Sequence, residues 1–534
     1  MQHIPVLIVG AGPSGLAVAL ELTRFGIPVR IIDRKATQTL TTNAAGIQTR
    51  TIEILEHIGI VKEFLDRGVV TKSLEIHSQK RRLAKVPLDV VDSFHKFILM
   101  LPQSDTEHIL NHELEKLNVR VERNVEFIEL RQENNKVISS LKYLDGKTEI
   151  VESDWLVGCD GYNSAVRNHA NIKMVGKDFD QEFFVADVRL KSKFDRSSVN
   201  MIINKGTLIG IFSLPNDQND KFRIVGNVGK DQNKDKFTEN EIKQIVEGYT
   251  EGECEVIEVI WSSPFWIHSK VASKLRNQSV FIAGDAAHVH SPAGAQGMNT
   301  GLQDAFNLSW KLALVINNKA QPTILDSYQE ERYPIIKNVI KFTEALAFLG
   351  LTNNSFLQGI RNFIFRNVTD KVRFIQRKMV GLITQTALKY KNSHIIIKQS
   401  NGHSSGPQPG ERAPDLVLSE NRRLYDYLRN NQHNLLLFTG PAPTTESIES
   451  IQDAYHKISD QLGSLIKPYI VSDKKINVPN LIQDNDLALH TRYAVSKPSM
   501  CLIRPDQYIG LFMGEVNPSL LGELLQKVGF QPIQ

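Results

Sequence analysis

Residues 280–311 read VFIAGDAAHVHSPAGAQGMNTGLQDAFNLSWK, which indicates a strand, a polar loop and a helix in immediate succession. The apolar run 280–283 is typical of a strand buried on both faces, and it ends at Gly284 and Asp285. Ligands of open α/β sheets bind at the carboxyl ends of the parallel strands. The stretch therefore predicts an α/β fold with a ligand site at Asp285.

The loop after this strand contains Pro292, Gly294 and Gly297, which suit a sharp turn and a close approach to a flat ligand. A helix is predicted to begin near Met298. Its apolar residues recur at helical spacing: Met298, Leu302, Ala305, Leu308 and Leu312. The free N–H groups at a helix start favour an anion. We expect Asp285 to bind a polyol hydroxyl and the helix start to face the part of a cofactor that becomes negative on reduction.

Length, charge and cysteine content limit the class of protein. The chain has 534 residues, more than one core usually holds, so two or three domains are expected. Its 63 basic and 59 acidic residues give a net charge of +4 without blocks of one sign, which favours neither a nucleic acid nor a membrane partner. Cys159, Cys254 and Cys501 lack metal-ligand spacing, so we expect no disulfide framework and a cytoplasmic location. No apolar run approaches the roughly 20 residues of a membrane span.

The second motif lies at the N-terminus, where a strand at 5–9 leads into a glycine-rich turn and a helix at 16–25. The turn consists of Gly10, Ala11, Gly12, Pro13, Ser14 and Gly15. Gly10 allows the tight turn, Gly12 lets the backbone approach a pyrophosphate, and Gly15 permits close helix packing. Asp33 ends the next strand, where its carboxylate suits an adenosine ribose and disfavours NADP. The pattern predicts a dinucleotide site but does not separate NAD from FAD.

A third motif distinguishes an FAD site from an NAD site. Residues 154–167 read DWLVGCDGYNSAVR, an apolar run that ends at Asp160 and Gly161 before a helix near Ser164. With three motifs in the order GxGxxG, DG and GD, the chain resembles the FAD-dependent aromatic hydroxylases. These single-component flavoprotein monooxygenases include phenol, pentachlorophenol, hydroxyphenylpropionate and polyketide hydroxylases. The resemblance covers roughly the first 345 residues.

The resemblance implies a set of cofactor-binding residues. For the ADP half of FAD and its surroundings they are Gly10, Gly12, Pro13, Ser14, Gly15, Asp33, Arg34, Arg50 and Gln103. For the nicotinamide cofactor, the ribityl chain and the flavin ring they are Asp160, Gly284, Asp285, Pro292, Gly297, Met298 and Asn299. Arg50 is also the candidate catalytic residue. The sequence departs from the family at Asn43, where many relatives have Arg, and at Ala295, where many have Gly.

The implied activity is hydroxylation of a phenolic or polycyclic aromatic compound through a flavin hydroperoxide, with O2 and either NADH or NADPH as co-substrates. The cofactor supplies the oxygen chemistry, so the protein must position the ring and exclude water. We therefore expect no Ser/His/Asp triad and no metal, and interpret His288 and His290 as loop hydrogen-bonding residues. Two alternatives stay open: an antibiotic-oxidising resistance enzyme of the rifamycin or tetracycline type, and a flavin-binding protein without hydroxylase activity.

The expected FAD-binding domain is Rossmann-like, of the glutathione-reductase type, and discontinuous, comprising residues 1–175 and 269–345. Between its halves, residues 176–268 alternate as in an antiparallel sheet. The resemblance implies that this sheet forms the roof of the substrate pocket. Phe212, Trp261, Phe265 and Trp266 are candidates to line it, with ordinary sheet packing as an equal alternative.

Residues 346–400 are predicted to be a basic helical region followed by the linker that begins the last domain. Phe356, Ile360 and Phe363 recur at helical spacing and could pack on the core or in a homodimer. Residues 401–534 are predicted to fold as β-α-β-β-β-α, a thioredoxin-like order, but they lack CxxC, so we expect a stabilising role rather than redox activity. Arg504-Pro505-Asp506 resembles a turn of the phenol-hydroxylase branch.

Overall fold

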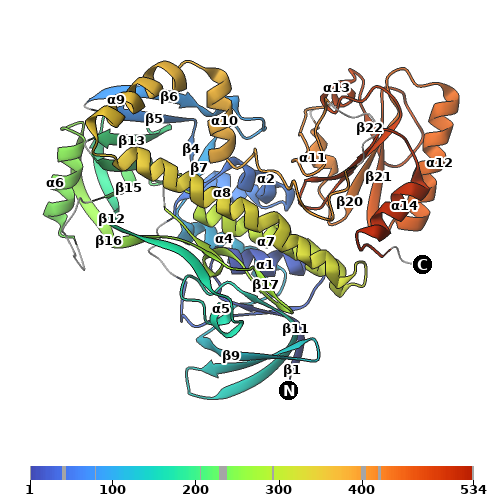
Figure 1. Ribbon diagram of the computed structural model, residues 1–534, viewed down its shortest axis with the longest axis horizontal. Helices are drawn as coiled ribbons and strands as arrows, with labels where there is room; N and C mark the ends of the chain where they lie inside the picture. Colours follow the sequence, from blue (N-terminus) through green and yellow to red (C-terminus); the bar gives the residue numbers. More distant parts are fainter. Residues whose placement is uncertain are drawn as a thin grey trace.

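The computed structural model describes residues 2–38, 44–78, 80–204, 206–227, 237–291, 294–398, 405–418 and 422–531. Figure 1 shows three parts: a central α/β part that contains the N-terminus, a second sheet beside it, and a C-terminal α/β part on the opposite side. Asn43 and Pro292, both singled out from the sequence, lie outside the described residues.

The central sheet has the strand order β17-β18-β11-β1-β2-β8. Its middle strand, β1 (Gln2–Val9), pairs in parallel with β11 (Thr148–Gly158) and with β2 (Val29–Asp33), and β18 (Val280–Ile282) pairs in parallel with β11. The carboxyl ends of these strands therefore share one edge. The sheet is completed by β8 (Glu122–Arg123), β9 (Val125–Glu133), β10 (Lys136–Tyr143) and β17 (Arg276–Asn277).

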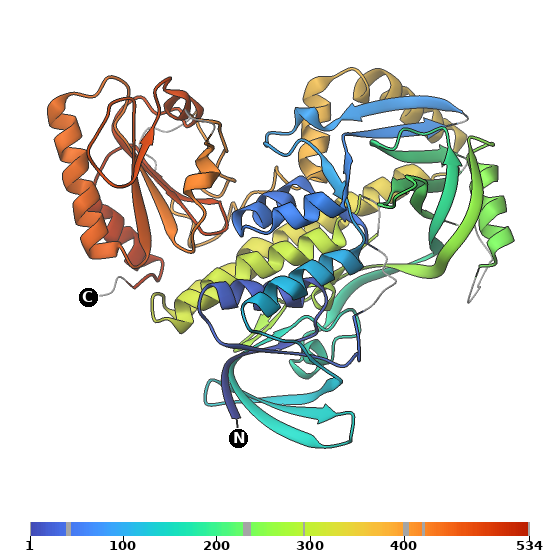
Figure 2. The ribbon, with the colours of Figure 1, turned by 180° about the vertical axis from the view of Figure 1, so that it is seen from behind.

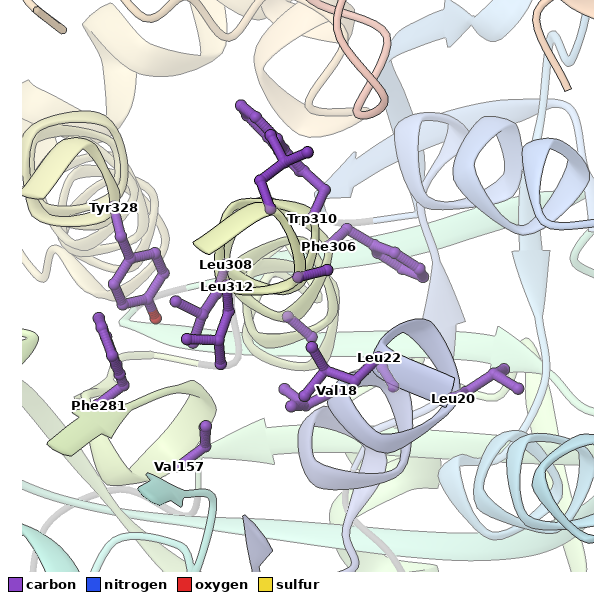
Figure 3. Close-up of a cluster of buried hydrophobic side chains, with 14 of the residues drawn as sticks. Val18, Leu20, Leu22, Val157, Phe281, Phe306, Leu308, Trp310, Leu312 and Tyr328 are labelled. Carbon is purple, nitrogen blue, oxygen red and sulfur yellow. The ribbon is translucent and has the colours of Figure 1, made fainter. Parts of the chain in front are cut away.

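Helices α1 (Pro13–Arg24) and α7 (Gly297–Ile316) pack against this sheet, and α4 (Gln103–Lys116) packs against α1. Helix α7 begins one residue before the predicted Met298 and is buried from Asn299 to Leu314. Figure 3 shows Leu308 and Leu312 of α7 among the side chains of α1 and the sheet. Each fully buried leucine contributes about 1.5–3 kcal/mol, so this contact fixes α7 over the carboxyl edge of the sheet.

Helix α8 (Asp326–Leu351) packs on α7 and reaches the second sheet. The Tyr328 hydroxyl near its start donates to the Ile282 carbonyl at 2.9 Å, which ties α8 to β18. Smaller elements complete the central part: α2 (Thr49–His57), α3 (Val61–Arg67), α5 (Ala165–His169), β3 (Gly46–Ile47), β4 (Val69–Thr71) and β7 (Ile98–Met100).

The second sheet has the order β19-β16-β12-β15-β14-β13-β5-β6. Its strands are β5 (Ser73–Ser78), β6 (Arg81–Pro87), β12 (Met174–Ser192), β13 (Ser198–Asn204), β14 (Thr207–Ser213), β15 (Lys221–Asn227), β16 (Cys254–Ala272) and β19 (His288–Val289). Two of them, β5 and β6, precede the range in which the sheet was expected, and β13 pairs with β5 in parallel. The sheet is therefore mixed and not purely antiparallel.

One face of this sheet packs on α6 (Glu239–Tyr249) through a core that includes Phe184, Ile211 and Ile224. The chain then passes through α9 (Ser355–Ile364), a π-helical turn at Phe365–Thr369, and α10 (Arg373–Ile383), which lie along β5 and β6 at the outer edge of the molecule (Figures 1 and 2).

The C-terminal sheet has the order β22-β21-β20-β23-β24. Its strands are β20 (His433–Phe438), β21 (Ile466–Ser472), β22 (Leu481–Gln483), β23 (Ser499–Ile503) and β24 (Ile509–Met513). Its helices are α11 (Leu424–Tyr427), α12 (Thr445–Leu462), α13 (Ala488–Arg492) and α14 (Pro518–Lys527). Every element predicted here from the sequence is present, and β22, α11 and α13 are additional.

Candidate cofactor and substrate site

The glycine-rich turn leaves one side of its backbone open. A Cβ atom on Gly10 would lie 2.4 Å from the Cys159 carbonyl oxygen, and one on Gly15 would lie 1.9 Å from the Gly10 carbonyl oxygen. No atom lies within 4 Å of the corresponding position on Gly12. Gly10 and Gly15 are thus required by packing, while Gly12 exposes backbone that a pyrophosphate can approach, as its place in the motif predicts.

Asp33 is fixed at the end of β2 by two backbone donors. The Ala11 N–H donates to Oδ2 at 2.7 Å, and the Lys35 N–H donates to Oδ1 at 2.8 Å. Arg123 lies 3.8 Å from the same carboxylate. Arg34, the next residue, is exposed. The turn and Asp33 are therefore held together at one edge, as an adenosine ribose site requires.

Gln103 begins α4 at the neighbouring helix start. Its side-chain amide donates to Glu107 at 2.9 Å, and its backbone N–H donates to the Ala44 carbonyl at 3.0 Å. Burial raises the pKa of Glu107 above its usual range. Gln103 is thus positioned beside the segment that leads from the nucleotide end toward the second sheet.

Asp160 of the DG motif stabilises the local turn. Its carboxylate accepts hydrogen bonds from the Ser164 hydroxyl at 2.5 Å and the Val166 N–H at 3.2 Å, while burial raises its pKa. Arg167 donates to the carbonyls of Tyr162 at 2.8 Å and Ala286 at 3.1 Å. The DG motif is in this way joined to the turn after β18, and any contact of Asp160 with a cofactor stays a prediction.

The GxGxxG and GD motifs interlock through Ser14. A Cβ atom on Gly284, or one on Gly301 of α7, would lie 2.4 Å from the Ser14 hydroxyl oxygen. Both positions therefore require glycine if Ser14 is to pack between them. This contact brings the start of α1, the turn after β18 and the first turns of α7 to one place.

Asp285 is the exposed residue of that turn. Among the described residues, none forms a hydrogen bond or ion pair with its carboxylate. Protein atoms nevertheless surround it on several sides, and this surrounding protein raises the pKa of the carboxyl, while His288 opposes the shift. Because the side chain is open to water, its oxygen atoms are available to a hydroxyl ligand.

A buried charge network, which the sequence analysis missed, lies directly behind Asp285. Asp304 of α7 accepts hydrogen bonds from His288 at 2.7 Å, from Arg332 of α8 at 2.7 Å and from the Gly284 N–H at 3.3 Å. The His288, Asp304 and Arg332 side chains are all fully buried. Burial opposes the charge on Asp304, but Arg332 and His288 outweigh it and lower the pKa of the carboxyl. The network holds the Gly284 turn against α7 and α8.

His290, unlike His288, does not pair with Asp304 and lies beside the start of α7. Burial lowers its pKa to about 4, so it is neutral at physiological pH. Its ring stacks on that of His288 with the centroids 6.3 Å apart, and its Nε2 atom is buried without a hydrogen-bond partner among the described residues. The position of a Cβ on Gly297 lies 3.9 Å from this atom. An unpaired polar atom beside the start of α7 fits a site that binds a polar ligand edge.

The loop before α7 is held by side-chain amides. Asn299 accepts from the Gln48 N–H at 2.8 Å and donates to the Gly46 carbonyl at 2.8 Å. Ala295 adopts the left-handed conformation, with φ +52°, which favours glycine. No side chain caps α7, while Met298 packs on the central core. Gly297 and Asn299 therefore lie in the first turn of α7, with Asn299 buried, and a contact of either residue with a cofactor stays a prediction.

Arg50 does not join these residues. Its guanidinium is fully buried and donates to Glu53 at 2.9 Å, to the Gln507 side chain at 2.8 Å and to the Asp506 carbonyl at 2.6 Å. Gln507 and Asp506 belong to the C-terminal part. This placement favours a structural role at the junction of the two parts over the catalytic and cofactor-binding roles predicted from the sequence.

The second sheet presents an aromatic row toward the cofactor edge. Phe212, Arg223, Asp187 and Trp261 are successive cross-strand partners, so their side chains share one face. Phe265 belongs to the same face and contacts Phe183, with the ring centroids 5.9 Å apart. Three of the four predicted pocket residues thus share one face of the sheet, and their contact with a substrate stays a prediction. Trp266 follows Phe265 directly and therefore points to the opposite face, where it is 47% exposed.

Arg223 and Asp187 form a paired charge within this aromatic face, with hydrogen bonds of 2.7 and 2.8 Å. Arg223 also donates to the Ala44 carbonyl at 2.9 Å, the oxygen that accepts the Gln103 N–H. The aromatic face is thereby fixed against the central part. The sequence analysis missed this pair, although a charged residue inside each of two apolar strands was a visible signal.

Within the described ranges, no group of three His, Cys, Asp or Glu side chains could hold a metal ion. A search of the same ranges finds no helix that is long and apolar enough to cross a membrane.

Comparisons with known proteins identify the family of the chain. A family described as FAD binding domain matches residues 3–343. The chain is 28% identical to pentachlorophenol 4-monooxygenase of Sphingobium chlorophenolicum, over 97% of this chain and 96% of that protein. It is 30% identical to a rifampicin monooxygenase of Streptomyces venezuelae, over 82% of this chain and 87% of that protein. The solved structure of OxyS anhydrotetracycline hydroxylase from Streptomyces rimosus aligns with a TM-score of 0.77 at 25% identity and covers 100% of both chains.

The chain therefore belongs to the FAD-dependent aromatic hydroxylase family. It is an FAD-dependent monooxygenase, as the order of its three motifs predicted.

Proposed function

We propose that this chain hydroxylates a phenolic or polycyclic aromatic compound, using FAD, O2 and NADH or NADPH. The proposal rests on the positions of two features, the Asp285 carboxylate and an aromatic face of the second sheet. The free carboxylate of Asp285 lies at the edge where the three motifs meet, and Arg223 fixes an aromatic sheet face against the segment beside that edge. Such an arrangement suits a flavin on one side and a flat substrate on the other.

Each part of the edge has an assigned role toward FAD. The open backbone at Gly12 would bind the pyrophosphate, and Asp33 would accept hydrogen bonds from the ribose. Asp285 would bind the ribityl hydroxyls, and the uncapped start of α7 would face the edge of the flavin ring that becomes negative. FAD bound along this edge would supply the chemistry that activates O2.

The substrate side is assigned to the second sheet. Phe212, Trp261 and Phe265 would contact the aromatic ring and exclude water from it. The Arg223–Asp187 pair would orient a substrate hydroxyl, because a paired charge in an apolar wall offers both a donor and an acceptor. The first test is substrate-stimulated oxidation of NADH and NADPH, with peroxide measured, across phenols, naphthoquinones, rifamycins and tetracyclines.

A compound that accelerates oxidation with little peroxide identifies the substrate class. Stimulation by rifamycins or tetracyclines alone would favour the resistance enzyme, an alternative supported by the similarity to rifampicin monooxygenase. Peroxide in proportion to all the oxidised cofactor, with every compound, would favour a flavoprotein without hydroxylase activity. Protein that holds no FAD and cannot be reconstituted with it would contradict the proposal.

We also propose a discontinuous FAD-binding domain, a thioredoxin-like class for the C-terminal part, and a cytoplasmic location; the second sheet extends beyond its predicted range, because β5, β6 and β19 belong to it. The strand order β21-β20-β23-β24, with β20 parallel to β21 and antiparallel to β23, supports the thioredoxin-like class. Cys501, its single cysteine, is buried, and burial raises the pKa of its thiol, so a stabilising role is favoured over a redox role. Three free cysteines support a reducing compartment.

A further inference from the structure

The segment around α9 exposes an unusual amount of apolar surface. Ten of the twenty exposed large hydrophobic side chains of the described residues lie between positions 348 and 382. The most exposed of these are Phe356 at 74%, and Phe348, Phe363 and Phe374 at 64% each. Contiguous exposed apolar patches mark binding surfaces, whereas scattered single residues do not.

Helix α9 is oriented with its apolar face outward. Phe356, Ile360 and Phe363 recur at i, i+4 and i+7, so they share one face, and all three are exposed. The opposite side carries Arg361, which is only 4% exposed and donates to the Leu349 carbonyl at the end of α8 at 2.9 Å. The fold thus buries the charged residue of α9 and exposes its phenylalanines, the reverse of an ordinary surface helix.

Basic residues border this surface. From residue 352 to 398 the sequence contains nine Lys or Arg and one acidic residue, Asp370. Asp370 accepts the Lys85 N–H at 2.8 Å. The exposed basic side chains nearest the apolar residues are Arg366, Lys371, Arg373, Arg377 and Lys378. The Lys378 ammonium lies 4.4 Å from the centre of the Phe374 ring, which places charge and apolar surface side by side.

We propose that this surface, formed by the end of α8, by α9 and by the start of α10, binds anionic lipid bilayers. An outward apolar helix face with a basic border is the pattern of a helix that lies in the membrane interface. Anionic headgroups would neutralise the basic side chains while the phenylalanines enter the acyl boundary. The whole chain has a net charge of only +4, so its composition does not reveal this local excess of basic residues.

Charge also argues against a second copy of the chain as the occupant. In a twofold interface the same patch meets itself, so basic borders would face one another across the contact. Figures 1 and 2 show α9 at the outer edge of the molecule, on the side away from the C-terminal part, where a flat bilayer can approach it.

The test is co-sedimentation of the FAD-loaded full chain with vesicles of phosphatidylcholine alone and of phosphatidylcholine mixed equally with phosphatidylglycerol. We expect binding to the anionic vesicles that weakens as salt is added. The double variant Phe356→Ser/Phe363→Ser should weaken it at least about tenfold, as should Arg373→Gln/Arg377→Gln/Lys378→Gln. Leu144→Ser, which removes a side chain that is 84% exposed on another hairpin, is the matched control and should bind unchanged.

Flavin content and thermal unfolding of each variant are measured alongside, so that loss of fold is distinguished from loss of binding. Three results would overturn the proposal: no binding of the parent chain to anionic vesicles, equal binding to both vesicle types, or unchanged binding by the two α9–α10 variants. A dimer that forms without lipid and dissociates in Phe356→Ser/Phe363→Ser would also overturn it, since the surface would then be covered by a second copy.

Discussion

Asp285 and Asp304 belong to the same strand-loop-helix stretch, yet their surroundings are opposite. Asp285 is exposed and has no partner among the described residues, while Asp304 is fully buried between His288 and Arg332. A buried carboxylate must be paired because its desolvation is costly, and such a group then fixes the fold. An unpaired carboxylate contributes little to stability and stays available for a ligand. The difference assigns Asp304 to structure and Asp285 to cofactor binding.

Breaking the buried network should have the largest effect. Asp304→Asn removes the charge that pairs with Arg332 and leaves a fully buried guanidinium uncompensated. The free energy of unfolding is expected to fall by about 3–5 kcal/mol. Denaturant unfolding of the apoprotein measures this. The matched variant Asp285→Asn should change the same quantity by less than about 0.5 kcal/mol, since that residue is exposed; equal losses at the two positions would remove the distinction.

A smaller effect is expected from pH, through His290. An unfolded histidine titrates near 6.5, whereas burial lowers the pKa of His290 to about 4 in the folded chain. Between these values the unfolded state binds the extra proton, so stability rises with pH and is lost as pH falls from about 6.5 to 4. His290→Gln should recover roughly 1–3 kcal/mol at the acidic end of this window.

The exposed His108 supplies the control for that measurement. His108→Gln should leave the pH dependence of unfolding as it is in the parent chain. His57 and His433, whose pKa values burial lowers to about 3, should keep part of the slope in His290→Gln. An unchanged slope in His290→Gln would show that this ring is not held neutral beside α7.

The smallest effect is expected in the loop between the two carboxylates. Ala295 has φ +52°, a conformation that costs a Cβ-bearing residue more than it costs glycine. Ala295→Gly should raise the free energy of unfolding by less than about 1 kcal/mol, because glycine also loses more entropy on folding. Ala494→Gly, at φ +52° in the C-terminal part, is the matched control and should give a similar gain. A loss of stability in Ala295→Gly alone would show that the loop needs the methyl group.

The parts of the fold that the sequence predicted are those set by local rules. Glycine spacing and apolar strands placed Gly10, Gly15 and the start of α7 correctly, because each follows from turn geometry or periodicity. Contacts between distant segments were not accessible in this way. The pairing of β13 with β5 and the burial of Arg50 against Gln507 depend on how separate elements pack, and no local pattern encodes either.

The contacts on the substrate face of the second sheet also could not be predicted from local sequence patterns. The sequence analysis named the neighbours Phe265 and Trp266 as joint pocket candidates, but a one-residue step reverses the face of a strand, so the two side chains lie on opposite faces of β16. Arg223 and Asp187 are separated by 36 residues and meet only because β12 and β15 are neighbours. The class of cofactor was predicted from the resemblance to a known family. The Arg223–Asp187 pair on the substrate face was found only in the structure.

The central claim is that Asp285 binds the cofactor and does not support the fold. It is tested most directly by the flavin content of purified Asp285→Asn and its FAD dissociation constant, measured beside the free energy of unfolding of the apoprotein. We predict FAD binding at least about tenfold weaker, because a charged hydrogen-bond acceptor is lost, with unfolding unchanged. Flavin retained at the parent level, or a weaker flavin contact accompanied by an equally destabilised apoprotein, would contradict the account.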